Sequence, residues 1–108
     1  MGRSWSLEVV VLPVGPVTCL LLAGELDGAG RGRFVEAVRT VLEDPVVERV
    51  SVDVALVDFC DSDGIGALLH AWRLARHTGT PLHLTGSRPS MRRLLRLADA
   101  TSLLLPVA

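Results

Sequence analysis

Four segments of the chain carry the apolar patterns of β-strands. The first is rich in β-branched residues and is followed by Pro13, which we expect to end it. The second follows a turn at Val14–Pro16, so the first two strands should pair as a hairpin. In the third, valines alternate with polar residues, as in a strand with one buried face. The predicted strands are residues 7–12, 17–23, 46–54 and 82–85.

Three other segments place apolar residues at helical spacing. The first helix is predicted over Arg33–Leu42, whereas the preceding Gly28–Gly32 stretch is predicted to be flexible. A second helix should begin at Asp61–Gly64 and stop at Gly79, because glycine suits the residue after a helix end. A third should begin at Ser87–Pro89, where proline fits the first helical turn.

The order of these elements indicates the fold class. A short apolar segment at Leu103–Val107 fits a last edge strand, which gives the order β, β, α, β, α, β, α, β. Alternating strands and helices require crossover connections and a largely parallel sheet. We therefore predict an α/β fold with a mixed, mostly parallel sheet, an antiparallel N-terminal strand and helices packed on the sheet. A chain of 108 residues, 49% of them apolar, fits one domain with its own core.

Composition excludes several classes of protein. Twelve acidic residues against 11 arginines give a net charge of −1, so no basic field exists for general nucleic-acid binding. No apolar stretch approaches a membrane span and the start lacks a secretory layout, so we expect a cytoplasmic protein without membrane insertion. The apolar content permits a homodimer. Cys19 and Cys60 are too few for a disulfide scaffold, and we expect both to be reduced.

The start of the second predicted helix concentrates polar residues and glycines. Asp61 or Ser62 can cap the free N–H groups there, and Asp63 suits the positive end of the helix dipole. Gly64 and Gly66 leave the first turn bare, so another backbone can approach it. The simplest interpretation is an N-cap that only stabilises the helix. The alternative is that the Ser62 hydroxyl accepts a phosphate, which the free N–H groups would favour and the two aspartates would oppose.

The sequence gives little support for an enzymatic site or a metal site. Ser62 lacks a G-x-S-x-G elbow, and none of the three histidines is evidently paired with it. Asp58, Asp61 and Asp63 form an acidic cluster that does not fit the spacing of an EF-hand loop. The glycines before the first helix do not match G-x-G-x-x-G. We therefore expect a binding protein with no enzymatic activity, no cofactor and no metal.

Four ordered segments of the chain resemble the STAS domain family, and more narrowly the small bacterial anti-sigma-factor antagonists. They are Gly24–Asp27, Val57–Leu69, Leu82–Gly86 and Pro89–Leu95. The resemblance covers nearly the whole chain and implies a single STAS domain over residues 1–108, with a core of about 7–106. The architecture of that family agrees with the order of elements predicted above.

The resemblance also implies a function. The family motif Asp-Ser-Ser/Thr-Gly-Leu/Ile-Gly carries a phosphorylated serine, which corresponds to Ser62, and Asp27 would lie beside it. The implied partner is an anti-sigma factor with a GHKL-type serine kinase domain, which binds the unmodified chain and releases the phosphorylated one. The implied partner-binding residues are Asp27, Asp61, Ser62, Asp63, Gly64, Ile65 and Gly66.

Two features depart from the family pattern. Asp63 stands where a second Ser or Thr is usual, so its charge could repel ATP or mimic the modified state. The Gly28–Gly32 stretch replaces the usual Thr/Ala-rich helix start. Two other roles also stay open. One is an accessory subunit of a transport or signalling complex, including lipid transport, which docks through the same helix face. The other is a sensor that binds a nucleotide or lipid at the strand ends.

Overall fold

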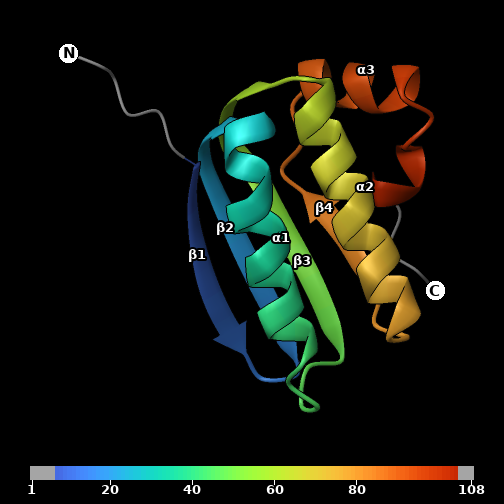
Figure 1. Ribbon diagram of the computed structural model, residues 1–108. Coiled ribbons are helices and arrows are strands. Elements are labelled where there is room, and N and C mark those ends of the chain that lie inside the picture. The colour runs from blue at the N-terminus through green and yellow to red at the C-terminus, as the bar shows by residue number, and fades with distance from the viewer. Residues whose placement is uncertain (1–6, 105–108) are drawn as a thin grey trace.

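In a computed structural model, which describes residues 7–104, helices cover one face of a four-stranded sheet (Figure 1). The strands lie in the order β1-β2-β3-β4; β1 is antiparallel to β2 and the other pairs are parallel. This confirms the predicted α/β class. The strands are β1 (Leu7–Val14), β2 (Val17–Leu26), β3 (Arg49–Cys60) and β4 (Leu82–Thr85). The helices are α1 (Gly28–Leu42), α2 (Ser62–His77), α3 (Pro89–Leu97) and the 3₁₀ helix η1 (Thr101–Leu104).

The core lies between the sheet and helices α1 and α2, which run side by side across it (Figure 1). Alternate residues of the central strands are fully buried, as Leu20 and Leu22 on β2 and Val50 and Val52 on β3 illustrate. Phe34 of α1 is equally buried. Because a slip of one residue would turn these side chains away from the helices, the apolar alternation fixes how β2 and β3 pair.

The predicted flexibility of Gly28–Gly32 is wrong, because these residues form the first turns of α1. Asp27 is the N-cap, and its Oδ1 accepts hydrogen bonds from the backbone N–H groups of Ala29 (3.0 Å) and Gly30 (3.1 Å). Gly30 is buried where α1 meets β1, and a Cβ on it would lie 3.1 Å from the Cβ of Leu7. Glycine therefore allows close packing here instead of flexibility.

The prediction that Pro13 ends the first strand is also wrong. β1 continues to Val14, and Pro13 stands opposite Thr18 of β2. β1 lies at the edge of the sheet and pairs with β2 alone. Proline is tolerated in an edge strand because the N–H group that it lacks need not face a neighbouring strand.

The third strand is displaced from the predicted residues 46–54 and runs from Arg49 to Cys60. Val46 lies in a turn, where its backbone N–H donates to the side-chain Oδ1 of Asp44 at 2.9 Å. Beyond residue 54 the strand continues because β2 pairs with it as far as Leu26. This extension carries the chain to the start of α2.

The predicted last strand is wrong for the part that the structure describes. Thr101–Leu104 forms a 3₁₀ turn that buries Leu103, whose backbone N–H donates to the carbonyl of Ala100 at 3.2 Å. Residues 105–107 of that prediction lie outside the described residues. Among residues 7–104, no helix has both the length and the apolar content that crossing a bilayer requires.

Candidate functional site

The parallel pairing of β2 and β3 brings two helix starts to one edge of the sheet (Figure 1). Leu26 and Cys60 are partners at the carboxyl ends of these strands. Each is followed by an aspartate that caps a helix: Asp27 caps α1 and Asp61 caps α2. The structure therefore places the sequence-predicted residues of two distant segments at the same edge, which is where open α/β sheets meet ligands and partners.

Ser62 is the first residue of α2, and its side chain is exposed. Asp61 performs the capping: its Oδ1 accepts from the backbone N–H of Gly64, and its carbonyl accepts from that of Ile65, both at 3.0 Å. The Ser62 hydroxyl forms no hydrogen bond with another residue in 7–104. It is therefore free to meet solvent or a partner.

Gly64 and Ile65 lie on the inner side of this first turn. A Cβ on Gly64 would overlap the carbonyl oxygen of Leu26 and lie 2.8 Å from the Sγ of Cys60. Ile65 is only 3% exposed and belongs to the core. These two residues hold α2 against the ends of β2 and β3, whereas Gly66 is half-buried and faces outward. The outward orientation of Ser62 follows from this inner contact.

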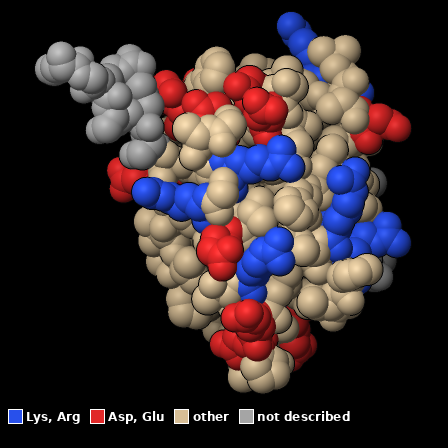
Figure 2. All heavy atoms as spheres, in the orientation of Figure 1, with Lys and Arg blue, Asp and Glu red and all other residues tan. Residues whose placement is uncertain are grey.

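Acidic side chains gather at the same edge. Asp63 is exposed, and its Oδ2 lies 3.3 Å from the position that a Cβ would take on Gly28, so the carboxylate sits beside the start of α1. A negative charge there is stabilised by the positive end of a helix dipole. Figure 2 shows red atoms clustered where the two helices begin. The acidic residues of this edge are Glu25, Asp27, Asp58, Asp61 and Asp63.

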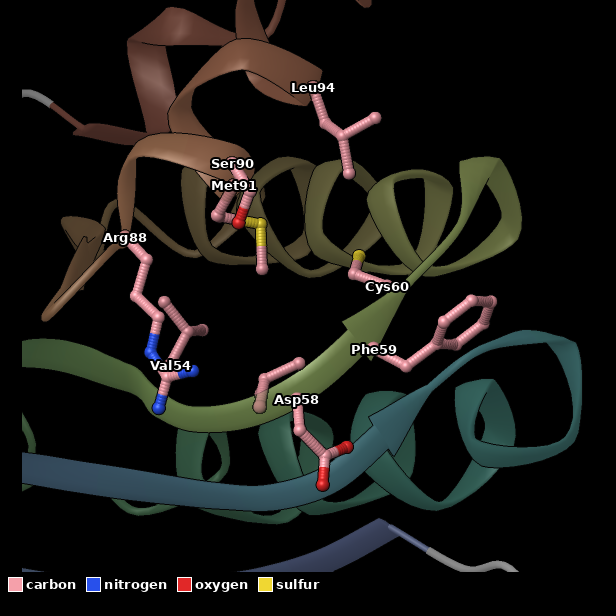
Figure 3. Close-up of a pocket in the computed structure, with 9 residues that line it drawn as sticks. Val54, Asp58, Phe59, Cys60, Arg88, Ser90, Met91 and Leu94 are labelled. Atoms are coloured by element: carbon pink, nitrogen blue, oxygen red, sulfur yellow. The ribbon is translucent and has the colours of Figure 1, made fainter.

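These carboxylates do not form a metal centre. Within residues 7–104, no group of three or more His, Cys, Asp and Glu side chains lies close enough to hold a metal ion. In Figure 3, Asp58 points away from α3 whereas Cys60, two residues further along β3, points toward it; the pairing of β2 with β3 has a register shift at Asp58. The edge therefore presents separate acidic side chains and not a convergent ligand set.

An apolar groove beside Ser62 was not predicted from the sequence. It lies between α2 and α3, has a volume of about 400 Å³, and is lined by Ser62, Ile65, Gly66, Leu69, Leu94, Leu97 and Ala98. Leu97 is 79% exposed, the largest exposure among the exposed large apolar side chains of residues 7–104. The signal in the sequence was a leucine outside the inward-facing set of an otherwise arginine-rich helix. It marks a surface that could bind an apolar group.

A second hollow lies on the other side of α3, at the end of β3 (Figure 3). Its volume is about 240 Å³, and Phe59, Arg88 and Met91 are among the residues that line it. Arg88 donates a hydrogen bond to the carbonyl of Ala55 at 2.7 Å, so its guanidinium is already engaged. This hollow is consequently a weaker candidate for binding than the groove beside Ser62.

Cys60 is a poor nucleophile at neutral pH. Burial, and then the charge of Asp61, raise the pKa of the Cys60 thiol from 9.0 to about 11. Its Sγ donates to the carbonyl of Asp61 at 3.6 Å. Cys19 and Cys60 are both free thiols, as predicted. The group at this edge that is available for chemistry is therefore the Ser62 hydroxyl.

Comparisons with known proteins agree with this architecture. The family described as "Mlab, STAS domain" matches residues 15–106. The anti-sigma factor antagonist SpoIIAA of Bacillus, in its unphosphorylated form, aligns with a TM-score of 0.77 and 18% identity, over 94% of this chain and 89% of its own. An anti-sigma factor antagonist from Mycobacterium paratuberculosis aligns with a TM-score of 0.78 and 18% identity, over 91% and 82%.

The same fold occurs inside a transporter. The murine Slc26a9 anion transporter in its inward-facing state aligns with a TM-score of 0.70 and 17% identity, over 80% of this chain and 14% of its own. At identities this low, these structural alignments establish a shared fold only. No curated protein matches the sequence.

Proposed function

Because the chain belongs to the STAS domain family, we propose that it is an anti-sigma-factor antagonist: a binding protein whose docking surface surrounds Ser62. The observation that carries the proposal is the exposed Ser62 hydroxyl, which Asp61 leaves free by capping α2 in its place. The fold shared with antagonists over more than nine-tenths of the chain supports the same role.

The proposed partner is an anti-sigma factor with a GHKL-type serine kinase domain, bound in the cytoplasm. In its unmodified form, the chain docks the start of α2 and the adjoining groove onto this partner. Kinase action transfers the γ-phosphoryl group of ATP to the Ser62 oxygen, which loses its proton as ADP leaves. The phosphate adds about −1.5 to −2 charges beside Asp61 and Asp63, and a surface that fitted the neutral hydroxyl no longer fits.

The position of Asp63 is compatible with this switch. Its carboxylate lies against Gly28 at the start of α1, on the side of α2 that faces that helix. There it interacts with the N-terminal ends of two helices. We infer that Asp63 stabilises the helix starts and does not mimic a phosphate on Ser62, so the chain begins in its binding form.

Phosphoryl transfer tests the proposal directly. The purified chain is incubated with Mg-ATP and each GHKL-type kinase encoded by its genome, and intact mass is measured. We expect one added phosphate on the unsubstituted chain and none on Ser62→Ala. Ser90→Ala is the matched control, because Ser90 is also exposed at a helix start, that of α3, and should leave the modification intact. An unmodified chain with every kinase would overturn the switch.

A second candidate function is an accessory subunit of a transport complex. One observation favours it: the same fold forms a segment of an anion transporter. Binding to a transport ATPase encoded nearby would distinguish this role from the first. In that case Ser62→Ala should leave complex formation unchanged, and no kinase should modify the chain.

A further inference from the structure

We propose that Arg31 binds the phosphate of phosphorylated Ser62 within the same chain, so that phosphorylation ties α1 to α2. This inference rests on the proposed phosphorylation of Ser62 and identifies the side chain that receives the new charge. It assigns to α1 a role that the sequence motif around Ser62 does not contain.

The geometry of α1 and α2 carries the inference. The Nη1 of Arg31 lies 3.6 Å from the position that a Cβ would occupy on Gly66, so the guanidinium of α1 reaches over the surface of α2. Ser62 and Gly66 are four residues apart on that helix and share one face, with Cβ positions about 5–6 Å apart. The guanidinium therefore lies about one helical turn from the Ser62 side chain, within reach of a phosphate by side-chain rotation.

The Arg31 side chain is not engaged by another residue in the described part of the chain. Its side chain is exposed and forms no hydrogen bond with another residue in 7–104, whereas Arg33 donates to the carbonyl of Leu7 at 3.1 Å. Gly66 places no side chain between the guanidinium and the surface of α2. Figure 2 shows arginine atoms directly below the acidic group at the helix starts. Arg31 is thus available as a ligand for a new anion.

The electrostatics of the site favour such a partner. Asp27, Asp61 and Asp63 all lie at this edge and would repel a phosphate dianion. An arginine offsets this repulsion, and its planar fork can bind two phosphate oxygens at once. Held by Arg31, the phosphate would lie over Gly66, which together with Ser62 lines the apolar groove. Phosphorylation would then cover the docking surface in addition to changing its charge.

The second pKa of the phosphate reports this contact. Phosphoserine is incorporated at position 62 by genetic encoding, so the test needs no kinase, and ³¹P NMR follows the titration. We expect the pKa of the phosphate to be about half a unit lower in the unsubstituted chain than in Arg31→Ala, with Arg31→Lys between them. His70 lies one turn beyond Gly66 on α2, where its imidazole could also contact the phosphate, so the comparison is repeated in a His70→Gln background.

Arg39→Ala is the matched control for net charge. Arg39 is exposed on α1 about 12 Å further along the helix, beyond the screening length of about 8 Å at physiological salt. It should leave the phosphate pKa unchanged. An equal pKa in the unsubstituted chain and Arg31→Ala overturns the proposal. A chain that no kinase modifies would instead overturn the proposed function and leave this result standing.

A second measurement avoids the modified amino acid. Ser62→Glu places a carboxylate near the same position, and thermal unfolding compares it with and without Arg31→Ala. We expect Arg31→Ala to lower the midpoint more in the Ser62→Glu chain than in the serine chain. Equal effects in the two chains would count against a bond between positions 31 and 62.

Discussion

The carbonyl of Leu26 lies so close to the Cα of Gly64 that no side chain fits between the end of β2 and the first turn of α2. A Cβ on Gly64 would be 3.0 Å from the carbonyl carbon of Leu26 and 2.8 Å from the Sγ of Cys60. Leu26 immediately precedes Asp27, the cap of α1. This one contact therefore sets how the two helix starts lie together and how Ser62 faces outward.

Gly64→Ala should lower the free energy of unfolding by about 3 kcal/mol, because the new methyl group must displace backbone and not a flexible side chain. Urea unfolding measures the change. Gly32→Ala is the matched control, since Gly32 lies in α1 with open space around it and should gain about 0.5–1 kcal/mol from better helix propensity. Equal stabilities of the two variants would contradict the contact with Leu26.

Asp61→Ala should cost about 1 kcal/mol of stability, because the backbone N–H of Gly64 loses the carboxylate oxygen that it donates to at 3.0 Å. Asp61→Asn should retain most of the stability, since the amide oxygen can accept the same hydrogen bond. Chemical unfolding of both variants tests this. If Asn and Ala were equally destabilising, charge and not capping would be the contribution of Asp61.

The order of elements was predictable because period-2 and period-3.6 patterns survive in the sequence wherever one face is buried. The start of α1 was not predictable, because glycine has a low helix propensity. The reason for glycine at position 30 is its close contact with Leu7, which only the structure shows. The prediction that Pro13 ends the first strand was wrong for a related reason. Proline stops a central strand, and only the sheet order reveals that β1 is an edge strand.

The candidate site was predictable as a motif and not as a surface. A run of aspartate, serine and glycine after a strand indicates a capped helix start, and the pairing of β2 with β3 places it beside Asp27. Which residue caps could not be decided from sequence, since Asp61 and Ser62 are both good caps. The sequence pattern could place Leu97 on the outer side of its helix, but the groove that it borders and the reach of Arg31 over Gly66 depend on how α1 and α3 pack against α2, which no local pattern encodes.

Cys60 should react with iodoacetamide at neutral pH about tenfold more slowly than an ordinary thiol. The rise of its pKa from 9.0 to about 11 lowers the thiolate fraction about a hundredfold, and the greater nucleophilicity of the more basic thiolate recovers part of this. The rate is measured in a Cys19→Ser chain, with an unfolded sample as the reference. A native rate equal to the unfolded rate would contradict the burial of Cys60.

Stability should fall as the pH drops below about 6.5, in part through His83. Burial, and then the charge of Arg49, lower the pKa of His83, and its Nδ1 is buried without a hydrogen-bond partner in residues 7–104. The unfolded chain therefore binds a proton more readily, so this contribution is complete above the unfolded pKa and declines as the pH falls toward the folded pKa. Urea unfolding from pH 5 to 8 should show a flatter profile for His83→Gln. His77→Gln, at the exposed end of α2, should keep the steeper profile.

Leu97 should contribute to partner binding and little to folding. Its side chain is 79% exposed at the groove beside Ser62, so Leu97→Ser removes almost no buried surface from the free chain. Burying a leucine in a complex contributes about 1.5–3 kcal/mol, so the variant should bind the cognate anti-sigma factor at least about tenfold more weakly in calorimetry. Leu56→Ser is the matched control, because Leu56 is 54% exposed on β3 and does not line the groove. Weakened binding in Leu56→Ser with normal binding in Leu97→Ser would place the docking surface away from the groove, and therefore away from the phosphate that Ser62 would carry.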